Sequence, residues 1–153
     1  MVLHLAASRD WPVHQLDVKN AFLHGDLHET VYSNQSTGFV DPEHPNHVCL
    51  LRKSLYGLKQ AQCEWFHRFA THIHGLGFKV SLSDSSLFVL THGTDTAHLL
   101  LYVDDIVLTA SSSVLLHRII NMLQKEFAMK DLGPVHFILS IQVRRTTDGF
   151  FLS

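Results

Sequence analysis

Several residue types are scarce in this chain, and each scarcity excludes a class of protein. The 153 residues include 2 Cys, 4 Pro and 8 Gly. Too few cysteines are present for a disulfide scaffold, and too little Pro and Gly for a collagen-like or low-complexity chain. A reducing, intracellular setting is the default expectation, and the localisation is otherwise unknown.

Charged residues and long apolar runs are also scarce. Charged side chains make up 17% of the sequence, and the formal net charge is −2. A free-standing nucleic-acid-binding domain is normally basic, so composition alone argues against one. No stretch reaches the ~18 apolar residues of a transmembrane helix, and the start lacks the basic region and apolar core of a signal peptide. We therefore expect no membrane partner.

The apolar residues that are present predict an α+β fold. They make up 46% of the chain, enough for a core, and the length fits one domain spanning residues 1–153. The first residues resemble the end of a helix. We expect a mainly antiparallel sheet with two helices packed on one face. The periodicity predicts strands at 13–18, 27–32, 48–51, 86–91 and 97–110 (split at 103–105), helices at 58–76 and from 113 to a stop at 133–134, and a closing hairpin at 135–152.

Two adjacent carboxylates, Asp104 and Asp105, interrupt the most apolar strand segment. Burying unpaired charge is costly, so this pair must lie at a turn, in water or beside a cation. Paired carboxylates are hard oxygen ligands suited to Mg²⁺. Asp is also common in ordinary turns, and for the dipeptide alone a plain turn is the better interpretation.

A third carboxylate, Asp17, ends the strand at residues 13–18. Taken alone, it is best interpreted as a cap for the turn that follows. If this strand lies beside the hairpin of Asp104 and Asp105, all three acids meet at one end of the sheet. Three such charges would repel one another unless divalent cations neutralised them. Two metals ~3.5–4 Å apart could then support phosphoryl transfer.

Four sequence blocks, in order along nearly the whole chain, closely resemble the reverse transcriptase domain of copia-type retrotransposons. Each block is suggestive, and the four together are highly specific. The blocks are Gln15–Leu27 (QLDVKNAFLHGDL), Leu55–Ala61 (LYGLKQA), Leu101–Ile106 (LYVDDI) and Met129–Gly133 (MKDLG).

The resemblance implies a polymerase palm and assigns roles to residues within the blocks. It implies that Asp17, Asp104 and Asp105 are catalytic and bind two Mg²⁺ ions, which activate the primer 3′-hydroxyl and hold the dNTP triphosphate. Phe22 resembles the sugar gate that clashes with a ribose 2′-hydroxyl, although without the family it would be interpreted as a core aromatic.

Two further residues are assigned to nucleotide binding by the same resemblance. Gln60 resembles the residue that packs near the incoming nucleotide, and an exposed Gln at a helix start is its alternative. Tyr102 is expected beside the primer end. Lys19 could meet a phosphate, but a solvated surface Lys is the better interpretation.

The family also implies partners, which are an RNA or DNA template-primer and dNTP. Its polymerases carry a fingers segment upstream and a thumb and ribonuclease H region downstream of the matched blocks. We expect these missing regions to supply most phosphate contacts, which dominate nucleic-acid affinity. The isolated chain is therefore expected to have little or no polymerase activity. The alternative function is a non-catalytic remnant or palm-like interaction module from a decayed element.

The 13 His residues raise a third hypothesis, a zinc-dependent regulator. The close pairs are His24 with His28, His44 with His47, and His72 with His74. A structural zinc site needs four ligands in recognisable spacing, usually with Cys. Scattered surface histidines are therefore the better interpretation.

Overall fold

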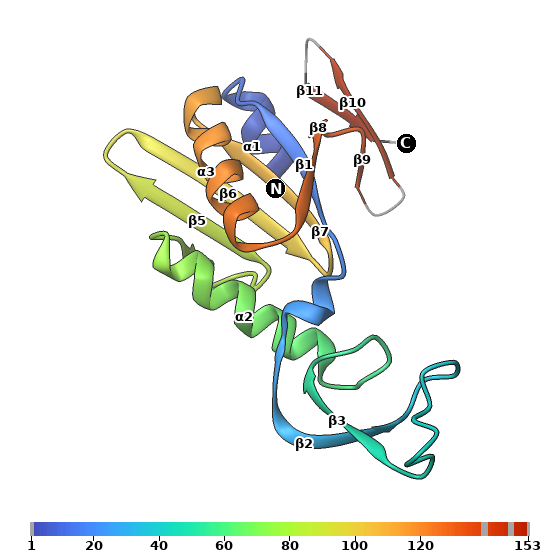
Figure 1. Ribbon diagram of the computed structural model, residues 1–153. Helices are drawn as coiled ribbons and strands as arrows, with labels where there is room; N and C mark the ends of the chain where they lie inside the picture. Colours follow the sequence, from blue (N-terminus) through green and yellow to red (C-terminus); the bar gives the residue numbers. More distant parts are fainter. Residues whose placement is uncertain (1, 139–140, 147–148, 153) are drawn as a thin grey trace. The chain divides into compact units, whose positions relative to one another are not determined.

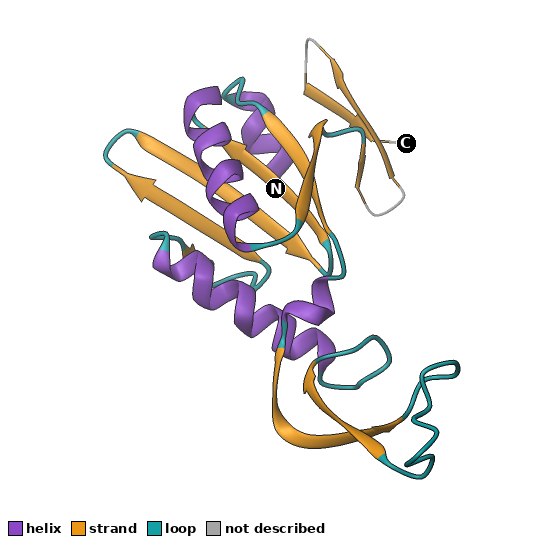
Figure 2. Ribbon diagram, viewed as in Figure 1, coloured by secondary structure: helices purple, strands orange, loops and turns teal. Residues whose placement is uncertain are grey.

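The computed structural model describes residues 2–138, 141–146 and 149–152, and it shows an α+β protein (Figures 1 and 2). The α+β class and the mainly antiparallel pairing are therefore confirmed. No helix in the described ranges is long and apolar enough to cross a membrane. The elements in chain order are α1 (Val2–Ser8), β1 (Val13–Val18), the 3₁₀ helix η1 (Ala21–His24), β2 (Asp26–Asn34), β3 (Val48–Lys53), α2 (Ala61–Gly75), β4 (Lys79–Val80), β5 (Leu87–His92), β6 (Asp95–Tyr102), β7 (Asp105–Ala110), α3 (Ser113–Glu126), β8 (Met129–Pro134), β9 (Phe137–Ile138), β10 (Ile141–Thr146) and β11 (Gly149–Leu152).

Two compact units make up the chain, one formed by residues 1–20 and 71–153 and the other by residues 21–70. The first unit contains the main sheet, whose strand order is β4-β5-β6-β7-β1-β8. Every neighbouring pair in this sheet is antiparallel. β1 lies between β7 and β8, so segments about 90 to 120 residues later in the chain cover both of its edges. The expectation of one partial palm domain over residues 1–153 stays a prediction.

Side chains alternate along β1, and the two faces of the sheet are covered by different helices. On one face, the ring of His14 contacts His117 of α3, with ring centroids 5.6 Å apart. On the other face, Val13 and Val107 form a buried cluster with Ala6 of α1. Alternation along β1 therefore places His14 and Leu16 on the face toward α3. It places Val13, Gln15 and Asp17 on the face toward α1.

The described residues form three α-helices, where the sequence predicted two packed on one face. α3 lies on one face (Figure 1), and the last turn of α2 reaches the same face, where His74 contacts Phe88 of β5 with ring centroids 6.3 Å apart. α1 covers the opposite face, at the end of β1 that begins with Val13. Its seven residues make only about two turns, shorter than the roughly 11–18 residues over which helical periodicity can be recognised, so the sequence indicated only a helix end there.

The second predicted helix begins where expected but ends earlier. The Ser112 side chain caps α3 by accepting a hydrogen bond from the Leu115 N–H. α3 ends at Glu126, because the next residue, Phe127, is extended and buries its side chain. The expected stop at Gly133–Pro134 was wrong. Those residues end β8, which pairs with β1 and was not predicted.

The closing hairpin is confirmed where the structure describes it. Thr146 pairs with Gly149 and Arg144 with Phe151, while the predicted turn residues 147 and 148 lie outside the described residues. The expected single strand from residue 135 is divided into β9 and β10. Val143 packs in the same cluster as Ala6, so this hairpin extends the α1 side of the first unit.

The second unit consists of η1, the antiparallel pair β2 and β3, and the first part of α2. Trp65 is its buried anchor, and Gly25 lies so close to Trp65 and Glu64 that an added Cβ would come within 3.0 Å. Much of the strand pair is exposed, including Tyr32 and Leu50.

Candidate functional site

The structure brings the backbones of the three predicted acids together at one end of the main sheet. Asp17 of β1 lies directly opposite Asp105 of β7, so their side chains are on the same face. The Val18 N–H donates to the Asp104 carbonyl at 2.9 Å, which makes the next position a hydrogen-bonded one. Asp17 and Asp105 therefore occupy a non-hydrogen-bonded pair, the closer type, with Cα atoms typically about 4.5 Å apart.

A two-residue turn places Asp104 and Asp105 at the tip of the β6–β7 hairpin. Tyr102 pairs with Asp105, so Val103 and Asp104 form the connection. Val103 has φ of 54° and is the only one of these two residues with positive φ, as in a type II′ turn. Gly usually occupies this position, so a β-branched residue there is strained.

Asp17 and Asp105 share a face of the sheet that α3 does not cover. Asp17, Asp104 and Asp105 are all partly buried, and Tyr102, which pairs with Asp105, is 55% exposed. Lys130 of β8 lies opposite Asp17 on its other side. Within the described part of the chain, no ion pair involves any of the three acids. Their one side-chain hydrogen bond there comes from the Gln15 amide, whose Nε2 lies 3.2 Å from Asp105 Oδ1.

The donor set fits a divalent oxygen-seeking cation by its chemistry. Carboxylate oxygens are preferred Mg²⁺ ligands, and two like charges directly opposite each other destabilise a sheet unless a cation offsets them. Among the described residues, no group of three His, Cys, Asp or Glu side chains lies close enough together to hold a metal ion. The backbone thus brings the three acids together, while their side chains are not arranged around a common point.

Comparison with known proteins supplies the family. The family model described as "Reverse transcriptase (RNA-dependent DNA polymerase)" matches residues 1–153. The chain belongs to the reverse transcriptase family. It is 45% and 44% identical, over its full length, to the retrovirus-related Pol polyproteins from transposons RE1 and RE2 of Arabidopsis thaliana, and 41% identical over 99% of its length to that from transposon TNT 1-94 of Nicotiana tabacum. These relatives confirm the resemblance to copia-type reverse transcriptases.

The chain spans only a small part of the length of these relatives. It covers 10%, 10% and 12% of the three relatives' lengths. No solved structure matches it. The family is therefore established from sequence, and the polymerase-palm assignment remains a proposal.

The other two predicted nucleotide-binding residues, Phe22 and Gln60, belong to the second unit. Phe22 lies in η1, half-buried, with its ring 4.5 Å from that of Tyr56. Gln60 directly precedes α2, its carbonyl accepts from the Glu64 N–H, and its amide lies 3.4 Å from the Glu29 carboxylate. The expected roles of Phe22 and Gln60 in nucleotide binding stay predictions.

Two neighbours of the acids were missed by sequence reasoning. Gln15 could have been found, because it is two residues before Asp17 on an alternating strand and must share its face. Lys130 could not, because its strand was interpreted as the segment that ends a helix. The Asp131 beside it is turned to the other face, where both carboxylate oxygens lie 3.0–3.1 Å from His14 Nδ1.

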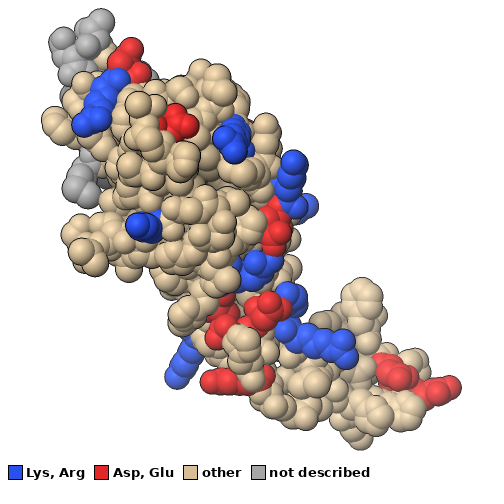
Figure 3. Space-filling view, turned by 90° about the vertical axis from the view of Figure 1, so that its left-hand side faces the viewer, with Lys and Arg blue, Asp and Glu red and all other residues tan. Residues whose placement is uncertain are grey.

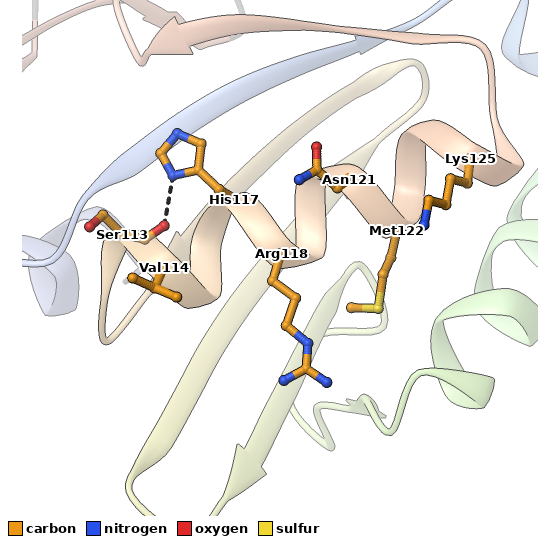
Figure 4. Close-up of a pocket in the computed structure, with 7 residues that line it drawn as sticks. All are labelled: Ser113, Val114, His117, Arg118, Asn121, Met122 and Lys125. Atoms are coloured by element: carbon orange, nitrogen blue, oxygen red, sulfur yellow. Dashed lines mark hydrogen bonds between the residues drawn. The ribbon is translucent and has the colours of Figure 1, made fainter.

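Figure 4 shows a shallow groove along α3. Its volume is about 640 Å³, and its lining comes entirely from the solvent side of that helix. The His117 ring is fixed there by a 2.7 Å hydrogen bond to the Ser113 carbonyl. α3 contacts His14, which is on the opposite face of β1 from Asp17. Since the main sheet lies between this groove and the face that carries Asp17 and Asp105, the groove is not part of the candidate site.

The surface and the histidines offer no stronger candidate. On the face shown in Figure 3, positive and negative side chains are interspersed among neutral ones, without a broad basic patch on the described residues. His44 and His47 stack at 4.4 Å in an exposed loop, and Cys49 and Cys63 are free and exposed. The zinc hypothesis thus gains no support from an assembled ligand set.

Proposed function

We propose that this chain is the palm segment of a copia-type reverse transcriptase, in which Asp17, Asp104 and Asp105 bind two Mg²⁺ ions for template-directed nucleotidyl transfer. The supporting observation is the placement of Asp17 opposite Asp105, with Asp104 bonded to the strand through its carbonyl. Two separate segments thereby contribute acids to one face of the sheet end, which is what two-metal chemistry needs.

The chain's own residues have definite tasks in this proposal. The three carboxylates hold the cations, and when bound these supply positive charge that activates the primer 3′-hydroxyl and stabilises the transferring phosphoryl group. Tyr102 is exposed beside Asp105 and offers a platform for the primer end. Phe22 would exclude a ribose 2′-hydroxyl, and Gln60 would pack near the incoming dNTP.

We propose that polymerase activity belongs to the intact enzyme and is weak or absent in this chain alone. The net charge of −2 supports this, because phosphate contacts by basic residues dominate affinity for template-primer. Primer extension on poly-rA/oligo-dT with Mg²⁺ tests it. We expect no extension above background, and extension that Asp104→Asn abolishes would overturn the proposal.

Metal binding tests the site independently of activity. Titration of the 153-residue chain with Mn²⁺, followed by electron paramagnetic resonance of the free ion, should reveal saturable binding. Asp17→Asn and Asp105→Asn should each weaken this binding. Asp95→Asn is the matched control, because Asp95 is an exposed acid at the other end of strand β6. Binding that is the same in all four proteins would contradict the metal assignment.

A palm-like interaction module remains the second candidate, and the exposed apolar side chains of residues 21–70 favour it. Phe39 is 84% exposed, Tyr32 62% and Leu50 54%. Tyr32 and Leu50 lie directly opposite each other on β2 and β3, and exposed apolar surface of this kind can mark an interaction site. Filter binding to a primer–template at several salt concentrations separates the candidates, because a steep salt dependence indicates a nucleic-acid surface and no binding favours the module.

A further inference from the structure

The hydrogen bond between Gln15 and Asp105 joins two residues that the sheet register forces into proximity. Gln15 lies opposite Val107, and Asp105 is two residues before Val107 on the same strand. The two side chains are therefore diagonal neighbours on one face, within reach of a long side chain. The Gln15 Nε2–Asp105 Oδ1 distance is 3.2 Å, and both residues are partly buried.

An amide is well suited to hold a carboxylate that must also bind a cation. The NH₂ group of Gln can only donate and an ionised carboxylate can only accept, so the direction of this bond is fixed. The bond uses one lone pair of Oδ1 and leaves the other carboxylate lone pairs available. Because the amide is neutral, it orients the acid and leaves the negative charge that attracts the cation. A Lys or Arg donor would instead offset that charge.

The bond also acts on one member of a pair of like charges. Asp17 is directly opposite Asp105, and Gln15 lies on the same strand as Asp17, one side-chain position earlier on that face. A donor at this position favours the Asp105 rotamer that points along the sheet toward Gln15. Partners that orient a metal ligand in this way typically change metal affinity or activity by about 10–100-fold when they are removed.

We propose that Gln15 is a positioning residue that orients the Asp105 carboxylate for divalent-cation binding. The proposal rests on the function proposed above for the three acids. Gln15 itself is not a metal ligand here, and its action on the cation passes through Asp105.

The test is Mn²⁺ affinity of the full chain, measured by electron paramagnetic resonance of the free ion. Gln15→Met removes the donor and keeps a similar length, and Gln15→Leu is a second donor-free variant in case the first fails to fold. Both should weaken Mn²⁺ binding by about tenfold. Gln124→Met is the matched control, since Gln124 is exposed on α3, and it should leave the affinity unchanged.

Double variants distinguish positioning from a general structural effect. In an Asp105→Asn background, Gln15→Met should cause no further loss of affinity, because the carboxylate that it orients is gone. In an Asp17→Asn background it should still weaken binding. Equal losses in both backgrounds would overturn the positioning role.

The outcomes also separate this proposal from the proposed function. If Asp105→Asn weakens binding and both Gln15 variants bind within twofold of the unaltered chain, the positioning role is wrong and the metal site stands. If neither Asp17→Asn nor Asp105→Asn alters binding, the metal site itself is wrong. Circular dichroism of each variant shows that the fold is retained when affinity is compared.

Discussion

Asp17 and Asp105 face each other across two antiparallel strands, one acid directly opposite the other. Such a pair is unfavourable for the fold in the absence of a cation. In the function proposed above, this unfavourable pairing is the cost of a site where divalent cations would bind.

Removing one charge of this pair should stabilise the metal-free chain. We expect Asp17→Asn to raise the free energy of unfolding in EDTA by about 0.2–1 kcal/mol. Added Mn²⁺ should stabilise the unaltered chain and have a smaller effect on the variant. Urea denaturation with and without the ion measures both. A variant less stable than the unaltered chain in EDTA would contradict the repulsion.

The turn residue Val103 should be replaceable with a gain in stability. Its φ of 54° places a β-branched side chain in the left-handed region, which costs roughly 1–2 kcal/mol. Asn tolerates this region, so Val103→Asn should raise the free energy of unfolding by about 1 kcal/mol. Val114→Asn, an exposed Val on α3, is the control and should not stabilise. Chemical denaturation compares the two.

Asp131 should matter for stability rather than for metal binding. Its carboxylate accepts from His14 Nδ1 and from the Gly133 N–H at 2.8 Å, joining β1 to the end of β8. Asp131→Ala leaves both donors partly buried without this acceptor, and we expect a loss of about 1–3 kcal/mol. Mn²⁺ affinity should be unchanged in the folded variant, in contrast to Asp105→Asn.

The half-buried His98 should make the fold sensitive to acid. Burial, and secondarily the positive charge of Arg9, lower the pKa of His98 below its ordinary value of 6.5. The unfolded chain then binds a proton where the folded chain does not, so stability is full above about pH 6.5 and falls as the pH drops through the lower folded pKa.

Thermal denaturation at pH 7.5 and pH 5.5 checks this linkage. His98→Gln should reduce the decrease in Tm between the two pH values. His92→Gln replaces an exposed histidine on the neighbouring strand and should leave that decrease as it is. An identical decrease in the unaltered chain and in His98→Gln would rule out His98 as its source.

The parts predicted from sequence are those whose signal is local. The strand predicted at residues 13–18 has the same bounds as β1. The hairpin of β6 and β7 is marked by two acids within an apolar run. Ser112 caps α3 as expected. The inference that Asp17 meets the acid pair required one assumption, that β1 lies beside the hairpin, and the register confirms it.

The parts that sequence reasoning missed depend on tertiary pairing. β8 contains Gly133 and Pro134, which locally favour a helix stop, but β1 offers an unpaired edge that this segment fills. Lys130 was missed for that reason. The roles of Phe22 and Gln60 come from the family resemblance and stay predictions, because neither residue shares a unit with the acids.

The central place of β1 has a consequence for synthesis of the chain on the ribosome. The strand that carries Asp17 is made early, but its two partners begin at residues 105 and 129. Pairing over such separations is slow and cannot begin until the later strands have emerged. A nascent or prematurely terminated chain can therefore contain all three aspartates in sequence and still hold β1 by at most one edge. A chain that ends within β7 would retain all three acids but lack part of the β1–β7 pairing that places Asp17 opposite Asp105.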